Sequence, residues 1–363
     1  MFAIKNIKLN NFRSYNNKMY EFSDKINVLY GANAVGKTSV LEAIAYLGLC
    51  KSFRGAKDKD VIKNDQSFFF VKGEFSFENE IKDEIIISFD GKDKKIKKNN
   101  YFFQKVSDFF GYFNVVTFEP VDLNLVKGGP IERRKFLDVN ISQYNKEYMV
   151  SIMRFNKILK KRNEFLKSIE ELTACNVEYL DSIDELFAKE AIRVIENREK
   201  FVKELNEEIK RTSFELSLGN EEVSVEYKPS EKVENFVKNL KNKRKYDMIS
   251  QSTSLGPHRD DVLVRINGKE AENYASQGQI RTAVIALKLG LATYLRKYNE
   301  KQIILLDDVF SELDKDRQNR LLELLNGKSQ IFITTTSVSN INEEIKKQSK
   351  LIEVTKENEI WAI

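Results

Sequence analysis

The alternation of apolar and polar residues changes twice along the chain. Near the N-terminus, short apolar or alternating blocks predict β-strands at 2–9, 26–29, 68–77 and 85–89. One helix interrupts these strands. Over residues 39–49 the apolar positions surround the helical wheel almost completely, which predicts a helix that is buried on most of its sides.

The middle of the chain has a helical period instead. Apolar residues step mostly by three and four over 141–172 and again over 180–209, which predicts two amphipathic helices. Because a polar break at 173–176 separates them, we expect an antiparallel helical hairpin whose arms are each about 45 Å long, at 1.5 Å per residue. The stretch 222–227 then predicts a strand, and 232–243 predicts a further helix.

Helices and strands alternate again from about residue 251. The pattern predicts strands at 261–266, 303–306 and 330–334, and helices at 280–298 and 316–325. Such alternation is typical of α/β folds. We therefore expect the two ends of the chain to contribute strands to one sheet.

Composition narrows the class of protein. A length of 363 residues exceeds a typical single domain of about 100–200 residues, and 41% hydrophobic residues with 25 Phe indicate a globular protein. The N-terminus lacks the apolar region of a signal peptide, and no run approaches the roughly 18 apolar residues of a membrane span, so we expect a cytoplasmic protein without a membrane partner. Two distant cysteines and a single histidine argue against a zinc site and a disulfide framework.

A phosphate loop follows the strand at 26–29 and precedes the helix at 39–49. The sequence of the loop fits the pattern G-x-x-x-x-G-K-[ST], whose backbone N–H groups bind phosphates at a helix N-terminus. Lys37 is expected to reach the β- and γ-phosphates of ATP, and the Thr38 hydroxyl to bind Mg²⁺. The predicted nucleotide-binding residues here are Gly31, Ala32, Asn33, Ala34, Val35, Gly36, Lys37, Thr38 and Ser39.

Two carboxylates end the apolar strand at 303–306. A phosphate-loop ATPase needs one acid to coordinate Mg²⁺ and a second group to activate the attacking water. We assign Asp307 to the metal and Asp308 to the water, as the catalytic base. The roughly 270 residues between this strand and the phosphate loop include the helical hairpin, which we interpret as an insertion into the ATPase.

A second loop suited to phosphate lies just before the helix at 280–298. It reads Ser276-Gln277-Gly278-Gln279, in which Ser276, Gly278 and Gln279 are candidate nucleotide contacts and Ser276 a candidate catalytic residue. A plain helix cap at Ser276 explains the loop equally well. The lone His258 and its neighbour Arg259 support either this loop or a hydrogen-bonded turn, and we favour the turn.

DNA contacts are expected from clusters of basic residues, because the net charge of +5 is too small to indicate nucleic acid by itself. Lysine and arginine concentrate at 92–98, 157–162 and 238–245. Such clusters bind phosphates without reading bases, although a solvated helix face is an equally good interpretation of any one of them. The candidate DNA-binding residues are Lys157, Lys160, Lys161, Arg162, Lys241, Lys243 and Arg244.

The order of these motifs resembles ABC-type ATPase heads of the SMC kind and, more closely, the RecF family of bacterial gap-repair proteins. The motifs are the phosphate loop, the helical insertion, the signature loop at Ser276, the acidic strand end and a D-loop at 311–314. The resemblance to RecF extends over nearly the whole chain. It is carried by Asn11-Phe12-Arg13-Ser14-Tyr15, Lys51-Ser52-Phe53-Arg54, residues 126–130, residues 133–138 and Gly256-Pro257-His258-Arg259-Asp260-Asp261.

The resemblance implies a fold and a mechanism. The fold would be an ABC-type head with mixed sheets around the phosphate-loop helix, made by residues 1–129 and 251–363, with a helical arm at 130–250. The signature loop of one protomer would complete the ATP site of the other, so that ATP binding drives homodimerisation and slow, DNA-stimulated hydrolysis releases the dimer. The implied function is an ATP-dependent DNA clamp at single-stranded gaps, and the implied partners are RecR, RecO and gapped or junction DNA.

Two other classes of protein make different predictions. A transporter ATPase subunit carries a histidine after the strand at 330–334, where this chain has Thr335 and Thr336. An SMC-like ATPase with a nuclease partner predicts a longer coiled coil or an added nuclease domain, for which the chain, ending at Ile363, has no room. Both remain alternatives to the DNA clamp.

Overall fold

The computed structural model describes residues 1–77, 80–310, 313, 315–325 and 327–356. These residues form two compact units, one made of 1–122 with 291–363 and the other of 123–290. Helix α11 (Gln277–Arg296) passes from the second unit into the first. The sequence-based domain boundaries at 129/130 and 250/251 stay a prediction.

The first unit contains a six-stranded antiparallel sheet. Its order is β2-β1-β4-β5-β6-β7, and the predicted strands at 2–9, 68–77 and 85–89 are confirmed as β1, β4 and β5. Strands β2, β6 and β7 were not predicted, because β2 and β6 are rich in asparagine or lysine and β7 has only three residues. The strands are β1 (Ala3–Phe12), β2 (Tyr15–Glu21), β4 (Phe69–Phe77), β5 (Glu80–Phe89), β6 (Lys94–Lys98) and β7 (Tyr101–Phe103).

A five-stranded parallel sheet forms the other layer of this unit. Its order is β14-β3-β13-β12-β8, so strands from both ends of the chain are paired, as expected. The two central strands β12 and β13 are buried throughout, which is usual for parallel sheets covered on both faces. The strands are β3 (Ile26–Tyr30), β8 (Asn114–Phe118), β12 (Gln302–Leu306), β13 (Gln330–Thr335) and β14 (Ser349–Glu353).

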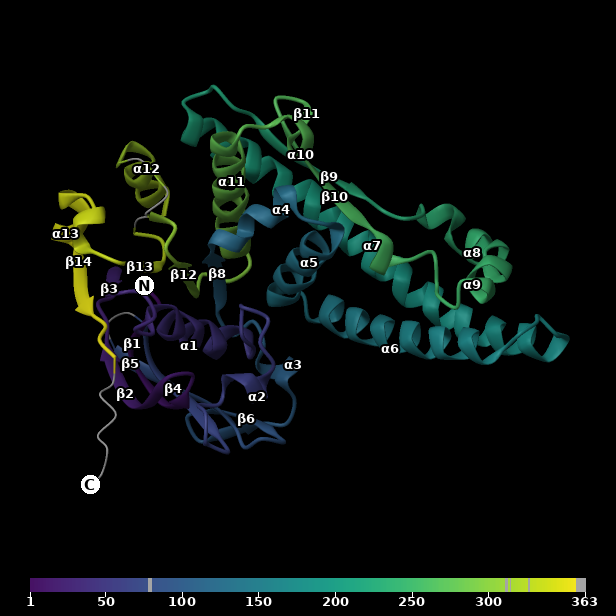
Figure 1. Cartoon of the computed structure of the whole chain (residues 1–363), viewed down its shortest axis with the longest axis horizontal. Coiled ribbons are helices and arrows are strands. Elements are labelled where there is room, and N and C mark those ends of the chain that lie inside the picture. Colours follow the sequence, from purple (N-terminus) through teal and green to yellow (C-terminus); the bar gives the residue numbers. More distant parts are fainter. Residues whose placement is uncertain (78–79, 311–312, 314, 326, 357–363) are drawn as a thin grey trace. The chain divides into compact units, whose positions relative to one another are not determined.

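Helix α1 (Lys37–Leu49) packs against strands of both sheets of the first unit (Figure 1). Its residues from Val40 to Leu49 are buried, including the acid Glu42, which confirms the prediction of a helix that is buried on most of its sides. The close approach needs small residues. A Cβ atom on Gly48 would lie 2.5 Å from Val115 of β8, and one on Gly73 of β4 would lie 2.6 Å from Leu47. The helix that follows the phosphate loop therefore lies in the core of this unit.

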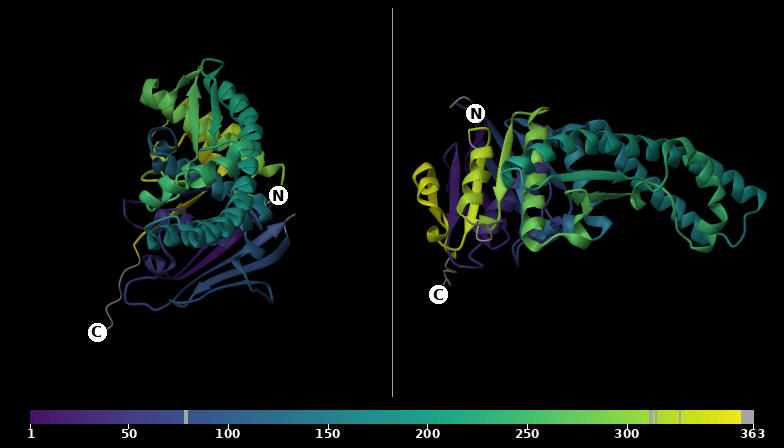
Figure 2. Two further views of the ribbon diagram at one scale, coloured as in Figure 1. Left: turned by 90° about the vertical axis from the view of Figure 1, so that its right-hand side faces the viewer. Right: turned by 90° about the horizontal axis from the view of Figure 1, so that it is seen from above.

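The second unit is mostly helical, and its long helices α6 (Lys146–Ser168) and α7 (Ala174–Ser217) run side by side (Figures 1 and 2). The predicted helical hairpin is present, but the prediction that both arms are about 45 Å long is wrong. Helix α6 has 23 residues and α7 has 44, so they are about 35 Å and 66 Å long. The first arm is short because Asn145 caps α6 by accepting from the Tyr148 N–H, which separates it from α5 (Pro130–Tyr144).

A small sheet of order β11-β10-β9 completes the second unit. The predicted strand at 261–266 is β10 (Asp261–Ile266), but it pairs with β9 (Val223–Lys228) and β11 (Lys269–Glu270), not with the five-stranded sheet. The alternation of helices and strands over 251–363 therefore did not predict which sheet this strand joins. The remaining helices are α2 (Asp58–Val61), α3 (Val106–Phe109), α4 (Asn124–Lys127), α8 (Val233–Asn242), α9 (Arg244–Ile249), α10 (Ala271–Tyr274), α12 (Lys315–Leu325) and α13 (Glu343–Gln348).

Within the described residues, none of the helices combines the length and apolar character that a membrane span requires.

Candidate nucleotide-binding site

The phosphate loop turns sharply between β3 and α1. Gly31 has φ 152°, Ala34 φ 61° and Gly36 φ 107°, so three residues of the loop have positive φ. A Cβ atom on Gly31 would lie 2.3 Å from the carbonyl oxygen of Val354, and one on Gly36 would lie 2.7 Å from the Tyr15 hydroxyl. The glycines are therefore required by close contacts as well as by the turn. Gly36 caps α1 without a side-chain hydrogen bond, which leaves the helix N-terminus open to an anion.

The Lys37 side chain folds back over the loop. Its Nζ donates to the carbonyl oxygens of Gly31 and Ala32, at 2.7 Å each. Burial lowers the pKa of Lys37, while Asp308 and Asp307 act in the opposite direction. The ammonium group is thus held where the phosphates of a nucleotide are expected, and it is bonded only to neutral carbonyl groups of the loop.

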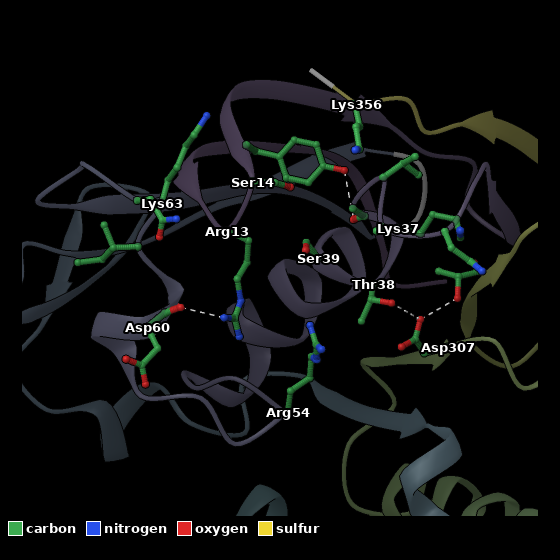
Figure 3. Close-up of a pocket in the computed structure, with 18 of the residues that line it drawn as sticks. Arg13, Ser14, Lys37, Thr38, Ser39, Arg54, Asp60, Lys63, Asp307 and Lys356 are labelled. Atoms are coloured by element: carbon green, nitrogen blue, oxygen red, sulfur yellow. Dashed lines mark hydrogen bonds between the residues drawn. The ribbon is translucent and has the colours of Figure 1, made fainter. Parts of the chain in front are cut away.

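Asp307 is the centre of a hydroxyl network at the end of β12 (Figure 3). Its Oδ1 accepts from Thr38 at 2.9 Å and from Thr334 at 2.8 Å. Burial raises the pKa of Asp307, and the two hydroxyl donors partly offset this. The strands β12 and β13 are parallel neighbours, so their carboxyl ends bring Asp307 and Thr334 to the same edge, next to α1.

Asp308 has an unusual backbone. Its φ is 53°, in the left-handed region, which costs a non-glycine residue of order 1–3 kcal/mol. The Asp308 N–H donates to the Thr334 hydroxyl at 2.9 Å, and this bond helps to hold the peptide in place. Its side chain is exposed and lines the same cavity as Lys37. The backbone turn therefore directs the second carboxylate into the site.

A cavity of about 1250 Å³ contains these groups (Figure 3). All of the described residues that line it belong to the first unit. They include Asn33 to Ser39 of the phosphate loop and helix, as well as Thr334, Asp307 and Asp308. Away from the loop the wall is made by residues that sequence reasoning did not assign: Arg13, Ser14, Tyr15, Arg54, Asp60, Ile62, Lys63, Asn64, Asp65 and Lys356.

Arg13 is held in place by a buried acid of α1. Its guanidinium bonds both carboxylate oxygens of Glu42, at 2.9 and 2.5 Å, and Glu42 is fully buried. The Ser52 hydroxyl also donates to Glu42, at 2.5 Å. A bidentate pair of this kind fixes the guanidinium rigidly. Arg13 and Ser52 stood out in the sequence only through the family resemblance, because the acid that joins them is hidden within the apolar helix.

The donor set at Thr38 and Asp307 fits a magnesium ion. Both oxygens are hard ligands, and the hydrogen bond between them places them at 2.9 Å. In the described part of the chain no three His, Cys, Asp or Glu residues gather into a metal site. A larger cluster is not required, because Mg²⁺ in nucleotide sites is usually bound by one or two protein oxygens, and phosphates and water complete its coordination shell.

The predicted signature loop lies in the second unit, at the start of α11. Ser276 caps the helix: its Oγ accepts from the Gln279 N–H at 3.3 Å, and the Gln279 side chain accepts from the Ser276 N–H at 3.0 Å. A Cβ atom on Gly278 would meet nothing within 4 Å, so its surface is open. The D-loop predicted at 311–314 falls, apart from Leu313, outside the described residues.

Burial corrects two of the seven candidate DNA-binding residues. Arg162 is 0% exposed, and its guanidinium pairs with Asp184 and Asp247, at 2.7 Å each. Arg244 is 7% exposed and pairs with Asp184 at 2.8 Å. These arginines join α6, α7 and α9 inside the second unit, so neither can reach DNA. The other five candidates are exposed: Lys157, Lys160, Lys161, Lys241 and Lys243.

His258 is a half-buried residue of a short 3₁₀ turn, Pro257–Arg259. Its Nε2 lies 2.9 Å from the Thr253 carbonyl oxygen, and its ring packs against Phe155. Burial lowers the pKa of His258 to about 4. The residue is therefore neutral at pH 7 and belongs to the interior of the second unit, which agrees with the favoured interpretation as a turn residue.

Comparisons with known proteins agree with this architecture. The family model described as RecF/RecN/SMC N terminal domain matches residues 3–361. The chain is 38% identical over 357 residues to DNA replication and repair protein RecF of Clostridium acetobutylicum, covering 97% of each chain. It is 37% identical over 364 residues to RecF of Bacillus cereus, covering 97% of this chain and 96% of that protein.

Solved structures give the same result. A structure of the recombination mediator protein RecF-ATP in the RecFOR pathway is similar with a TM-score of 0.85 and 34% identity, covering 94% of each chain. The Smc head domain from Pyrococcus furiosus is similar in fold, with a TM-score of 0.55 and 17% identity, covering 98% of this chain and 94% of that chain.

The fold and these matches define the class as an ATPase head of the RecF/SMC type, as the sequence predicted. Within that class, the chain belongs to the RecF family of DNA replication and repair proteins.

Proposed function

We propose that this protein binds ATP with Mg²⁺ in the cavity of the first unit and uses ATP-driven homodimerisation to clamp DNA at single-stranded gaps during recombinational repair. The observation that carries the proposal is the meeting of Lys37, Thr38 and Asp307 at one end of a cavity that also opens onto the phosphate-loop helix. Membership of the RecF family, with a relative described as RecF-ATP, supports the same nucleotide.

Binding of ATP changes the partners of Lys37. The ammonium exchanges two neutral carbonyl acceptors for the charged β- and γ-phosphates, and charge-assisted hydrogen bonds are roughly twice as strong as neutral ones. The N-terminus of α1 and the loop N–H groups add to this attraction. Magnesium, when bound, would neutralise phosphate charge, and Thr38 and Asp307 are the residues that would hold it.

Hydrolysis needs a group that orients and deprotonates water beside the γ-phosphate. Asp308 is proposed for this role, because its exposed carboxylate lines the cavity while its backbone is tied to Thr334. In the family's manner, Ser276, Gly278 and Gln279 of a second protomer would close over the γ-phosphate. The open surface of Gly278 and the exposed end of α11 are compatible with such a contact.

The proposed clamp acts in the cytoplasm with RecO and RecR, as the RecFOR pathway of the solved relative suggests. The exposed lysines Lys157, Lys160, Lys161, Lys241 and Lys243 are proposed to attract DNA through its phosphates. ATP binding by both protomers would favour the closed dimer, and hydrolysis would remove that preference, so the nucleotide sets the lifetime of the clamp on DNA.

Sedimentation tests the proposal directly. The purified protein is examined with ATP, with ADP and without nucleotide, each with and without a gapped duplex at two salt concentrations. We expect the protein to dimerise with ATP but not with ADP or without nucleotide. We expect this dimer to bind DNA more tightly than the monomer does. A protein that remains monomeric and binds DNA equally in all three nucleotide states contradicts the clamp.

Two variants separate binding from hydrolysis. Lys37→Ala is expected to lose ATP binding and dimerisation together, and retained ATP-dependent dimerisation would remove the assignment of the phosphate loop. Asp308→Asn is expected to bind ATP and to accumulate as a dimer, because only the hydrolytic step is slowed. Normal turnover by Asp308→Asn would exclude it as the base.

A further inference from the structure

The free edge of the six-stranded sheet combines exposed aromatic side chains with exposed lysines. Strand β7 is the edge strand, and its Tyr101 and Phe102 are 64% and 55% exposed. The neighbouring strand β6 carries four lysines in five residues. An aromatic ring beside cations is the arrangement with which proteins bind unpaired nucleic acid bases and their phosphates.

The lysines of β6 divide according to the face of the sheet. Lys94 and Lys98 are turned toward the protein, where Lys94 bonds the Cys50 carbonyl at 2.5 Å and Lys98 pairs with Asp83 at 2.9 Å. They share their face with Ile96, which is 2% exposed. Because successive side chains of a strand alternate, Lys95 and Lys97 lie on the outer face. Lys94 and Lys98 therefore stabilise the fold, whereas Lys95 and Lys97 can contact a ligand.

Phe102 lies on the same outer face as these two lysines. It is directly opposite Lys97 in the antiparallel pairing of β6 and β7, and the Lys97 Nζ is 5.7 Å from the centre of its ring. Lys95, two residues along the strand, is 64% exposed, and its Nζ lies 3.6 Å from a carboxylate oxygen of Asp90, which is itself half exposed. One exposed ring, one exposed lysine and one partly exposed lysine therefore lie on the same face of the sheet.

Lysines lie at the outer edge of this face and also toward its middle, where Lys8 of β1 is opposite Lys72 of β4. Toward the middle of the sheet, Lys72 of β4 is already paired with Glu84 at 2.5 Å and with Glu74 at 3.5 Å. The outer surfaces of β6 and β7 have no such carboxylates among their described residues; Asp90 lies before β6, in the loop. A polyanion is thus favoured at the edge over the centre of the sheet.

We propose that Lys95, Lys97 and Phe102 form a binding surface for single-stranded DNA, in which a base stacks on Phe102 and the two lysines contact phosphates. This deepens the proposed function and depends on it, since it names the DNA contact of the clamp. An unpaired strand fits better than a duplex, because only an unpaired base exposes the face that can stack on a ring. Because stacking and phosphate contacts do not distinguish one base from another, we expect binding of any sequence.

The test measures DNA binding by the full-length protein with ATP, using fluorescence anisotropy with a labelled single strand and with a labelled duplex. Phe102→Ala is expected to weaken single-strand binding about 5- to 150-fold, the range for loss of one stacked base, with a smaller effect on the duplex. Phe102→Trp retains a ring and should restore binding. Matched controls lie on β14 of the other sheet: Leu351→Ala and Lys350→Ala remove an exposed apolar side chain and a charge.

The lysines have a separate readout. The double variant Lys95→Ala, Lys97→Ala is expected to reduce the slope of log K against log salt by about 1.4, since each contact to a single strand contributes about 0.7. Lys350→Ala should leave that slope unchanged.

The outcomes distinguish this surface from the clamp itself. If the unmodified protein binds ATP and single strands, and Phe102→Ala binds single strands with the same affinity, the proposed surface is overturned and the clamp stands. This holds even if Phe102→Ala changes the binding of a protein partner. Equal losses for single strand and duplex would overturn stacking. If the unmodified protein binds neither ATP nor DNA, the proposed function fails first.

Discussion

Thr334 is expected to control hydrolysis through its hydrogen bonds to Asp307 and Asp308. Its hydroxyl donates to Asp307 at 2.8 Å and accepts from the Asp308 N–H at 2.9 Å, so one side chain links the proposed metal ligand to the proposed base. Thr334→Val keeps the shape and the β-branched character that strand β13 favours, and it removes both bonds. The change therefore isolates the hydroxyl.

The magnitude follows from the two bonds. A hydrogen bond to a charged group contributes about 1.5–3 kcal/mol and a neutral one about 0.5–1.5 kcal/mol. The valine removes the acceptor of the Asp308 peptide N–H, where φ is 53°, and it removes one of the two hydroxyls that donate to Asp307, so that the Thr38 hydroxyl stays. If about 1.4–3 kcal/mol of this appears in the barrier, kcat falls about 10- to 150-fold.

Steady-state ATP hydrolysis and thermal unfolding are the assays. The KM for ATP should change little, because Lys37 and the loop N–H groups are untouched, and Thr334→Ser should recover the rate. Thr335→Val is the matched control: its hydroxyl donates to the Ser337 carbonyl at 3.1 Å and is not bonded to either aspartate. A Thr334→Val protein with the kcat of the unmodified protein would refute the argument that this hydroxyl positions Asp308.

Three further predictions concern stability and the loop. Because burial raises the pKa of Asp307, the folded state binds its proton more tightly than the unfolded state does, and stability is lost as pH rises from 3.8 through the folded pKa. Asp307→Asn, without nucleotide, should therefore melt at a higher temperature than the unmodified protein at pH 7 and not at pH 3.5, each unit of raised pKa being worth about 1.4 kcal/mol; equal differences at both pH values would contradict this. Arg162→Ala leaves the buried Asp247 without its arginine and the buried Asp184 with Arg244 alone, and it should lower the free energy of unfolding by about 3–5 kcal/mol in a denaturant titration. Lys160→Ala, at a 77% exposed side chain, should change the free energy of unfolding by less than about 0.5 kcal/mol, and an equally small change for Arg162→Ala would contradict the burial of Arg162. Gly36→Ala brings a methyl group to 2.7 Å from the Tyr15 hydroxyl at a φ of 107°, so ATP affinity measured by calorimetry should fall at least about tenfold, and unchanged affinity would show that the loop adapts.

The sequence by itself determined the elements with strong local signals. The phosphate loop, the mostly apolar helix after it and the strand ending in Asp307 and Asp308 each consist of consecutive residues, and their period or spacing is set by the geometry of one helix, strand or turn. The membership of both chain ends in one sheet could be inferred because parallel strands need crossovers through other elements.

Only the tertiary structure decided which distant residues meet. Thr334 joins the site because β13 lies beside β12, and Arg13 is fixed there because Glu42 faces it from α1. The sequence predicted Arg162 as a surface cation, whereas in the structure it is buried between Asp184 of α7 and Asp247 of α9. A charged side chain has the same sequence signal whether water or a buried carboxylate solvates it, because the environment is supplied by residues far away along the chain.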